Sequence, residues 1–180
     1  MRRLLAITSL LLCAVLAPAQ PQSSGKKITK VVGGGGPAAE ERAPGDGLLV
    51  GFELSLGKFV DRDVIRSLRP IYRTAEGKEV KGKQYGTPEG KVLRTRARAG
   101  YSVGGVQVRT GLLIDGLSVI YMKVDGDRLD RDDTYQSAWV GNNFGGSPST
   151  LAGDGTAVVG FAARTTANNK ECSGLGLILR

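Results

Sequence analysis

Histidine is absent from this chain of 180 residues. Without an imidazole the chain lacks the usual general base near neutral pH, and most hydrolytic triads and catalytic zinc sites are excluded. Catalysis would have to use paired carboxylates or lysine, and the sequence contains no recognisable pair of nucleophile and base. We therefore expect a protein that is not an enzyme, with no catalytic residues, no metal site and no cofactor.

Cysteine is scarce too, with two copies in the chain. One of them, Cys13, lies within residues 1–19, which have the pattern of a signal peptide. A basic start precedes an apolar run at residues 4–17, too short to span a bilayer, and a small-x-small motif at residues 17–19. We expect cleavage near Gln20 and a protein that is secreted, periplasmic or at the cell surface, without stable membrane insertion and without a nucleic-acid partner. A membrane anchor and a lipoprotein attached through Cys13 are the alternatives.

Removal of this segment takes away Arg2 and Arg3 and lowers the formal net charge from +8 to +6. It leaves Cys172 as the single cysteine, so no intramolecular disulfide can form. Cys172 stands next to the apolar residues 175–179, and we expect a buried, unreactive thiol. The remaining length of about 160 residues suits one domain with its own core.

Long apolar stripes with a 3.6-residue period are missing after the signal segment, so no long helix is expected. Short runs alternate between apolar and polar residues instead, as in residues 52–56 and 106–109. This alternation is typical of half-buried strands. The 27 glycines lie mainly at the ends of these runs, which favours an all-β protein with many tight corners.

A two-strand unit recurs three times along the chain, at Val50–Tyr72, Val103–Tyr121 and Val159–Leu179. Each copy begins with a Val-Gly pair, and consecutive glycines of these pairs lie 53 and 56 residues apart. Each copy ends in a run with an apolar residue at every second position. Three such units in one small chain predict an all-β body with approximate threefold symmetry.

Glycine-rich corners precede the three units in the sequence, at residues 33–36, 81–87 and 139–147. A corner and a hairpin repeated three times would form three four-stranded antiparallel sheets arranged as a prism with pseudo-threefold symmetry, which leaves few free edges. We expect this β-prism over residues 31–180, preceded by a flexible linker at residues 20–30.

Four segments, taken together with their order along the chain, resemble the jacalin-related lectins, a family with the β-prism fold. VQVRTGLLIDGLSVIY (residues 106–121) is similar to the family's segment in which Gly-x-x-x-Asp leads into a strand. VGGGGP (32–37) and GNNFGGSPS (141–149) resemble its glycine-rich corners, and AVVGFAAR with SGLGLIL (157–179) resembles its closing hairpin. The resemblance covers residues 31–180 and implies a secreted, non-catalytic module that binds a glycan or polysaccharide.

The resemblance also implies where a sugar would bind, at one end of the prism. In this family, main-chain amides of a short loop and an aspartate hold the sugar hydroxyls, beside a glycine-rich corner that lets the ring approach. The matching positions form one candidate carbohydrate-binding site: Gly111, Asp115, Phe144, Gly145 and Gly146. Phe144 is an exposed ring that can stack on a sugar, a role also open to Tyr85, whereas Trp139 is expected in the core.

The other two repeats depart from the family's pattern. In the third, Ser173 stands where the family has aspartate, and the loop at residues 165–171 is longer than usual. In the first, residues 58–63 contain Asp61 and Asp63 but no Gly-x-x-x-Asp. The alternative to a lectin is a structural or envelope-associated interaction protein that keeps the β-prism without binding sugar, in which an aspartate only caps a turn.

Two charged segments are further candidates for binding sites. Five carboxylates within residues 125–133 would suit calcium, but their spacing differs from an EF-hand and arginines interrupt them, so a solvated hairpin tip is expected. Arg94, Arg96 and Arg98 alternate with smaller residues and would share one face of a strand. They form either a solvated face or a basic stripe for acidic polysaccharide or an anionic envelope surface.

Overall fold

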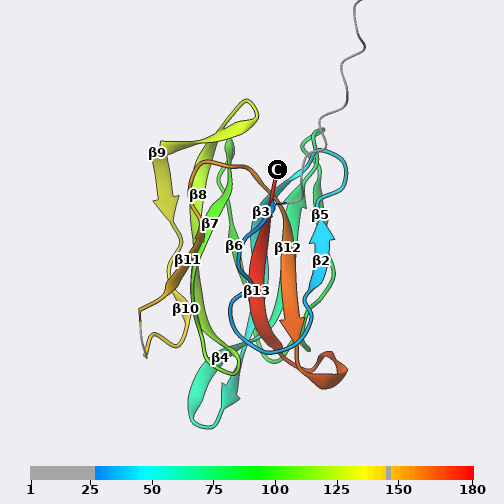
Figure 1. The fold of residues 1–180 in the computed structure, drawn as a ribbon, viewed down its shortest axis with the longest axis vertical. Coiled ribbons are helices and arrows are strands. Elements are labelled where there is room, and N and C mark those ends of the chain that lie inside the picture. The colour runs from blue at the N-terminus through cyan, green and yellow to red at the C-terminus, as the bar shows by residue number, and fades with distance from the viewer. Residues whose placement is uncertain (1–26, 145–146) are drawn as a thin grey trace, which may run out of the picture.

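The computed structural model describes residues 27–144 and 147–180, and nearly all of its regular elements are strands (Figure 1). The expected signal peptide, most of the expected linker and the candidate residues Gly145 and Gly146 lie outside the described residues. The strands are β1 (Lys27–Ile28), β2 (Ala39–Arg42), β3 (Leu48–Phe59), β4 (Arg62–Arg73), β5 (Glu79–Lys81), β6 (Val92–Arg96), β7 (Tyr101–Thr110), β8 (Ile114–Asp125), β9 (Arg128–Gln136), β10 (Val140–Gly141), β11 (Ser149–Ala152), β12 (Val158–Thr165) and β13 (Cys172–Leu179). A 3₁₀ turn, η1 (Ala167–Asn169), precedes β13, and no helix in the described ranges is long and apolar enough to cross a membrane.

The strands form two hydrogen-bonded sheets. One has four strands in the order β1-β13-β12-β2. The other has nine, along the path β11-β7-β8-β4-β3-β6, with β5 added to β4 and with β9 and β10 added to β8. Within the larger sheet a single residue pair, Ile65–Ile114, joins β4 to β8. The all-β prediction is confirmed, but the strands form two sheets instead of three separate ones, because this one pair bridges two groups of strands.

The three repeated units are antiparallel hairpins: β3–β4, β7–β8 and β12–β13. All three turn at the same end of the molecule, the lower end in Figure 1, and the C-terminus lies toward the other end. Each hairpin contains two β-bulges, at which one strand carries an extra residue. The first bulge lies at the Val-Gly opening, at Val50, Gly104 and Val159. The second lies near the turn, at Arg66, Asp115 and Ser173.

Gly51 shows why a Val-Gly opening needs a residue without a side chain. Strand β6 pairs with β3 at this point, and a Cβ atom placed on Gly51 would lie within 3.0 Å of the Thr95 carbonyl oxygen. Real Cβ atoms do not come that close, so any other residue would push β6 away from the sheet. The neighbouring bulge at Val50 increases the local twist and helps to wrap the strands around the core.

The core is built from the inward faces of all three hairpins. Phe52 of β3 and Phe161 of β12 are fully buried and pack edge to face, with ring centroids 5.5 Å apart. Burial of a side chain of this size stabilises the fold by roughly 1.5–3 kcal/mol. Cys172 is fully buried in the same cluster, as predicted from its apolar neighbours, and burial raises the pKa of its thiol to about 12.

The paired strands begin earlier in the chain than the sequence suggested. Within the predicted flexible linker at residues 20–30, strand β1 pairs with the end of β13. The Thr29 amide then donates a hydrogen bond to the Leu177 carbonyl oxygen at 2.9 Å. This part of the prediction is wrong because a polar composition does not reveal the free edge of β13, whose main-chain groups supply the partners.

Candidate functional site

Asp115 is the extra residue at the bulge near the turn of hairpin β7–β8. The turn before it is short: the Gly111 amide donates to the Leu113 carbonyl oxygen at 2.9 Å, and both Gly111 and Leu112 are exposed. A bulge changes the direction of the side chain that it carries, and bulges are common beside functional sites. The loop lies at the end of the molecule where all three hairpins turn (Figure 1).

The main chain and the side chain of Asp115 have different roles. The carbonyl oxygen accepts a hydrogen bond from the Asn142 amide at 2.8 Å, which ties the loop to the following glycine-rich corner. The carboxylate forms no hydrogen bond or ion pair within residues 27–144 and 147–180. A Cβ atom placed on Gly111 would lie 3.7 Å from its Oδ2 atom, so Gly111 borders the carboxylate. No side-chain contact in these ranges supports the alternative that Asp115 only caps its own turn.

The corner at residues 139–144 is held against this loop. Gly141 has a φ of 93°, and a Cβ atom there would lie within 3.0 Å of the Asp115 carbonyl oxygen, so both the backbone conformation and the close approach require glycine. Trp139 donates from Nε1 to the Asn142 carbonyl oxygen at 3.1 Å. Together these contacts position the corner beside Asp115.

Two of the three aromatic residues in the corners, Trp139 and Tyr85, differ in burial from the expectations. Trp139 is partly buried and packs at the corner against Gly116, where its Nε1 finds an acceptor that an apolar core would not supply. Tyr85, which was expected to be exposed, is 5% exposed, and its hydroxyl donates to Glu41 at 3.2 Å. Phe144 is 75% exposed, as a stacking ring would be.

The contact between a bulge and a glycine recurs in the other two hairpins. In each hairpin, the carbonyl oxygen of the bulged residue near the turn lies against a glycine with positive φ. The pairs are Asp115 with Gly141, Arg66 with Gly86, and Ser173 with Gly33. Each glycine belongs to one of the three glycine-rich corners, so each hairpin end is matched with one corner.

A second shared feature is a side chain that holds the corner. This side chain belongs to the first strand of each hairpin, at the last paired residue before the bulge that the second strand carries. Arg109 Nη1 donates to the Asn143 carbonyl oxygen at 2.6 Å, and Arg164 Nη1 donates to the Gly33 carbonyl oxygen at 2.7 Å. In the first hairpin, Ser55 Oγ accepts at 3.1 Å from the amide of Glu89, two residues after the corner at residues 81–87. The three hairpin ends thus share one main-chain plan and differ in the side chain at the bulge.

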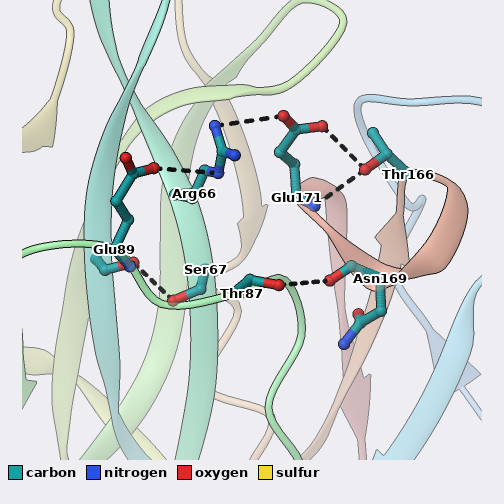
Figure 2. Close-up of polar contacts among 8 residues, drawn as sticks. Arg66, Ser67, Thr87, Glu89, Thr166, Asn169 and Glu171 are labelled. Carbon is teal, nitrogen blue, oxygen red and sulfur yellow. Dashed lines mark hydrogen bonds and ion pairs between the residues drawn. The ribbon is translucent and has the colours of Figure 1, made fainter.

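In hairpin β3–β4 the bulge carries Arg66, whose charge is already balanced (Figure 2). The guanidinium group forms ion pairs with Glu89 at 3.5 Å and with Glu171 at 3.4 Å. Glu171 also accepts a hydrogen bond from the Thr166 hydroxyl at 2.9 Å, which fixes the loop between β12 and β13. The aspartates of residues 58–63 lie farther along, toward the tip. The first repeat therefore presents a neutralised arginine where the second has Asp115.

In hairpin β12–β13 the bulge carries Ser173, the position at which the resemblance leads one to expect aspartate. Ser173 is 4% exposed, and a Cβ atom placed on Gly34 would lie 2.5 Å from its Oγ atom. The first glycine-rich corner therefore packs directly on the serine, and a neutral hydroxyl replaces the carboxylate. Among the three equivalent bulges, Asp115 is the one with an acidic side chain.

The basic stripe on β6 lies on one exposed face, as the alternation of residues predicted. Two of its three cations have an acidic partner, because Arg94 and Arg96 share one carboxylate, Glu79, at 3.0 and 2.5 Å. Arg98 lies over the Tyr135 ring, with its Cζ atom 3.9 Å from the ring centroid. These contacts favour the solvated-face interpretation of the stripe.

The acidic segment at residues 125–133 surrounds the turn of the β8–β9 hairpin, where Asp125 pairs with Arg128. The Asp127 side chain at this turn is 97% exposed, which fits a solvated tip. Across the residues that the structure describes, no group of three or more acidic, cysteine or histidine side chains is placed to hold a metal ion.

The fold is that of the jacalin-related lectins, as the resemblance in sequence predicted. A jacalin-related lectin from Ananas comosus, described as mannose-binding, superposes with a TM-score of 0.60 at 19% identity, covering 87% of this chain and 98% of the lectin. The artocarpin–mannotriose complex gives 0.61 at 16% identity, covering 86% and 97%, and Malaysian banana lectin gives 0.59 at 16%, covering 87% and 99%. No known protein-family model matches the sequence, and no curated protein matches it either. At these identities the likeness defines the fold, and function must be argued from the site.

Proposed function

We propose that this chain is a non-catalytic carbohydrate-binding module whose site lies at the β7–β8 loop, around Asp115. The observation that carries this proposal is the state of the Asp115 carboxylate. It is partly exposed, it has no partner within the described chain, and it borders Gly111 beside a firmly held corner. A carboxylate accepts hydrogen bonds from two hydroxyls at once, which suits a sugar ring.

A sugar bound here would make three kinds of contact. The Asp115 carboxylate would accept from two adjacent hydroxyls, the exposed main chain at Gly111 and Leu112 would approach the ring closely, and Phe144 would cover an apolar face. Hydrogen bonds to a charged group are worth roughly 1.5–3 kcal/mol each. The freedom that the sugar loses on binding offsets part of this gain, and stacking on Phe144 adds to it.

We also propose that the three hairpins form a β-prism with pseudo-threefold symmetry. Support comes from the recurrence, in each hairpin, of a bulge near the turn, a positive-φ glycine against it and a side chain that holds the corner. The signal-like pattern of residues 1–19 supports a location outside the cytoplasm: secreted, periplasmic or at the cell surface. Two structural neighbours, named as mannose-binding and as a mannotriose complex, support a glycan as the partner.

A second candidate function is that of an interaction protein that keeps the fold without binding sugar. The observation that favours it is the exposure of large apolar side chains in the loops and at one strand end: Phe59 at 43%, Val60 at 82%, Leu112 at 76% and Phe144 at 75%. Such side chains would be buried against an envelope component or another protein. Asp115 would then be dispensable for binding.

A glycan array tests the proposal, using the chain from residue 20 onward and two variants that each remove one negative charge. Asp115→Asn keeps the size of the side chain but weakens it as an acceptor, and we expect at least about a tenfold loss of affinity. Asp61→Asn, at the exposed β3–β4 tip, is the matched control and should bind as the unchanged chain does. Binding to no glycan, or undiminished binding by Asp115→Asn, would exclude this site.

A further inference from the structure

A groove of about 640 Å³ lies between the β7–β8 loop and the first glycine-rich corner. Its walls include Thr110–Leu112, Gly33–Gly35 and Ser149. Among the described residues that line it, the charged ones are Lys30 and Arg164, and both are cationic. A Cβ atom placed on Gly35 would have no other atom within 4 Å, so the glycine wall leaves the groove open. The groove therefore presents positive charge in a space of ligand size.

Arg164 is a partly buried cation without a counter-charge among residues 27–144 and 147–180. Its Nη1 atom donates to the carbonyl oxygens of Gly33 at 2.7 Å and Gly34 at 3.1 Å, and its Nε atom is buried without a hydrogen-bond partner in the described chain. No carboxylate of the described residues forms an ion pair with it. Arg66, at the equivalent end of hairpin β3–β4, pairs with two carboxylates instead.

An uncompensated cation in a half-buried place points to an anionic ligand. Carbonyl dipoles orient the guanidinium group, but they leave its net charge unbalanced, and partial burial of a charge costs free energy until a counter-charge arrives. A carboxylate or sulfate entering the groove would form charge-assisted hydrogen bonds with the guanidinium group. The exposed Lys30 would add a second cation with a flexible reach.

We propose that this groove binds the anionic group of an acidic glycan, either a uronate carboxylate or a sulfate, through Arg164 and Lys30. The inference rests on the proposed glycan-binding function and narrows the class of glycan. Gly111 lines the groove and also borders the Asp115 carboxylate, so one oligosaccharide can reach both places. In contrast, Arg94 and Arg96 of the β6 stripe already share Glu79 as their counter-charge.

Calorimetric titration with matched pairs of ligands tests the groove. Oligogalacturonate is compared with its methyl ester, which has the same rings without the charge, and dextran sulfate is compared with dextran. For the unchanged chain we expect at least one acidic ligand to bind about tenfold or more tightly than its neutral partner, with a preference that weakens as salt is added. The pair that shows the preference identifies the group as carboxylate or sulfate.

Three variants assign the preference to residues. Lys30→Gln should lower it several-fold and Arg164→Gln should remove it, whereas Lys91→Gln, an exposed lysine outside the groove, should leave it unchanged. Lys30 is exposed and no hydrogen bond of its side chain supports the fold, so its variant decides the matter even when Arg164→Gln does not fold. A preference that survives Lys30→Gln, or one that Lys91→Gln weakens equally, would overturn the proposal.

The same titrations separate this inference from the function on which it rests. Equal binding of acidic and neutral ligands would overturn the groove as an anion site and leave the lectin proposal standing. An acidic preference that depends on Lys30, together with an affinity that is unchanged in Asp115→Asn, would support the groove and remove the site at Asp115. If the chain binds none of the four ligands and no glycan on the array, both proposals would be overturned.

Discussion

The Asn142 amide donates a hydrogen bond to the Asp115 carbonyl oxygen at 2.8 Å, so the main chain of Asp115 holds the corner in place. Its carboxylate takes no part in that task. The carbonyl oxygens of Arg66 and Ser173 also lie against corner glycines, so the main-chain plan is common to the three hairpins. The side chain at the bulge can therefore vary without loss of the fold. In this chain Arg66 is neutralised by two carboxylates, Ser173 is buried and Asp115 is partly exposed.

The first prediction concerns the glycine against Asp115. Gly141→Ala places a Cβ atom within 3.0 Å of the Asp115 carbonyl oxygen at a φ of 93°, and we expect it to lower the free energy of unfolding by about 3 kcal/mol or more. Gly90→Ala is the matched control, because Gly90 has a φ of 61° but open space around it, and it should cost about 1 kcal/mol. Urea unfolding measures both, and equal losses would show that the close approach does not matter.

The second prediction concerns Arg66, which joins two loops. Its side chain is 17% exposed and that of Glu171 is 19% exposed, so Arg66→Gln leaves a sheltered carboxylate without its cation. We expect a loss of about 1–3 kcal/mol in the free energy of unfolding and faster proteolysis of the loop between β12 and β13. Lys58→Gln breaks the exposed pair with Asp63 and should cost at most about 1 kcal/mol. A similar small effect at both positions would contradict a structural role for Arg66.

The third prediction is a loss of stability at alkaline pH. Burial raises the pKa of the Tyr121 hydroxyl to about 12 from 10.0, and burial raises that of the Cys172 thiol to about 12 from 9.0. Below about pH 8 both states keep these protons, and neither group affects the unfolding equilibrium. As pH rises through 9.0 and 10.0 the unfolded chain releases first the thiol proton and then the phenol proton, while the folded chain retains both, so stability falls as pH rises toward 12. The slope is about 1.4 kcal/mol per pH unit for each group.

Urea unfolding of the chain from residue 20 onward, repeated between pH 8 and pH 11, measures this slope. Tyr121→Phe removes one of the groups whose pKa is raised in the folded chain, so the slope above pH 10 should become shallower in that variant. Thiol labelling gives an independent check, because native Cys172 should stay unmodified by iodoacetamide at pH 8 and react once the chain is unfolded. A flat stability profile up to pH 11 would be incompatible with the burial of these groups.

The fourth prediction concerns the basic stripe on β6. Because Arg94 and Arg96 share Glu79, Glu79→Gln should release two guanidinium groups and delay elution from a heparin column. Glu76→Gln makes the same change in net charge at a neighbouring turn, where no cation of the described residues pairs with the carboxylate, and it should shift elution much less. Coincident elution of the two variants would mean that net charge alone governs the retention of this protein.

Much of the fold could be predicted from local patterns, and the errors occur where long-range contacts decide. Alternation along residues 52–56 and the repeated Val-Gly pairs led to the three hairpins. The polar composition before residue 31 concealed strand β1, which depends on the edge of β13. Tyr85 was expected on the surface, but its bridge to Leu68 carries it into the core.

Only part of the candidate site could be predicted from local sequence patterns. The Gly-x-x-x-Asp spacing placed Gly111 near Asp115, because a tight turn within these five residues keeps the two ends of the segment close together. The roles of Arg66 and Arg164 escaped detection, since each depends on partners far away in the chain. A signal was present for Arg164, because Arg-Thr stands before the turn in both the second and the third repeat.

By itself, the sequence determined the strands, their glycine corners and the absence of histidine chemistry, because periodicity and residue type act over a few neighbouring positions. Tertiary structure alone decided which hairpin end keeps an open carboxylate, which one is neutralised and where an unbalanced cation faces a groove. Those outcomes depend on charges and acceptors brought together from distant segments, and only the folded chain sets their distances.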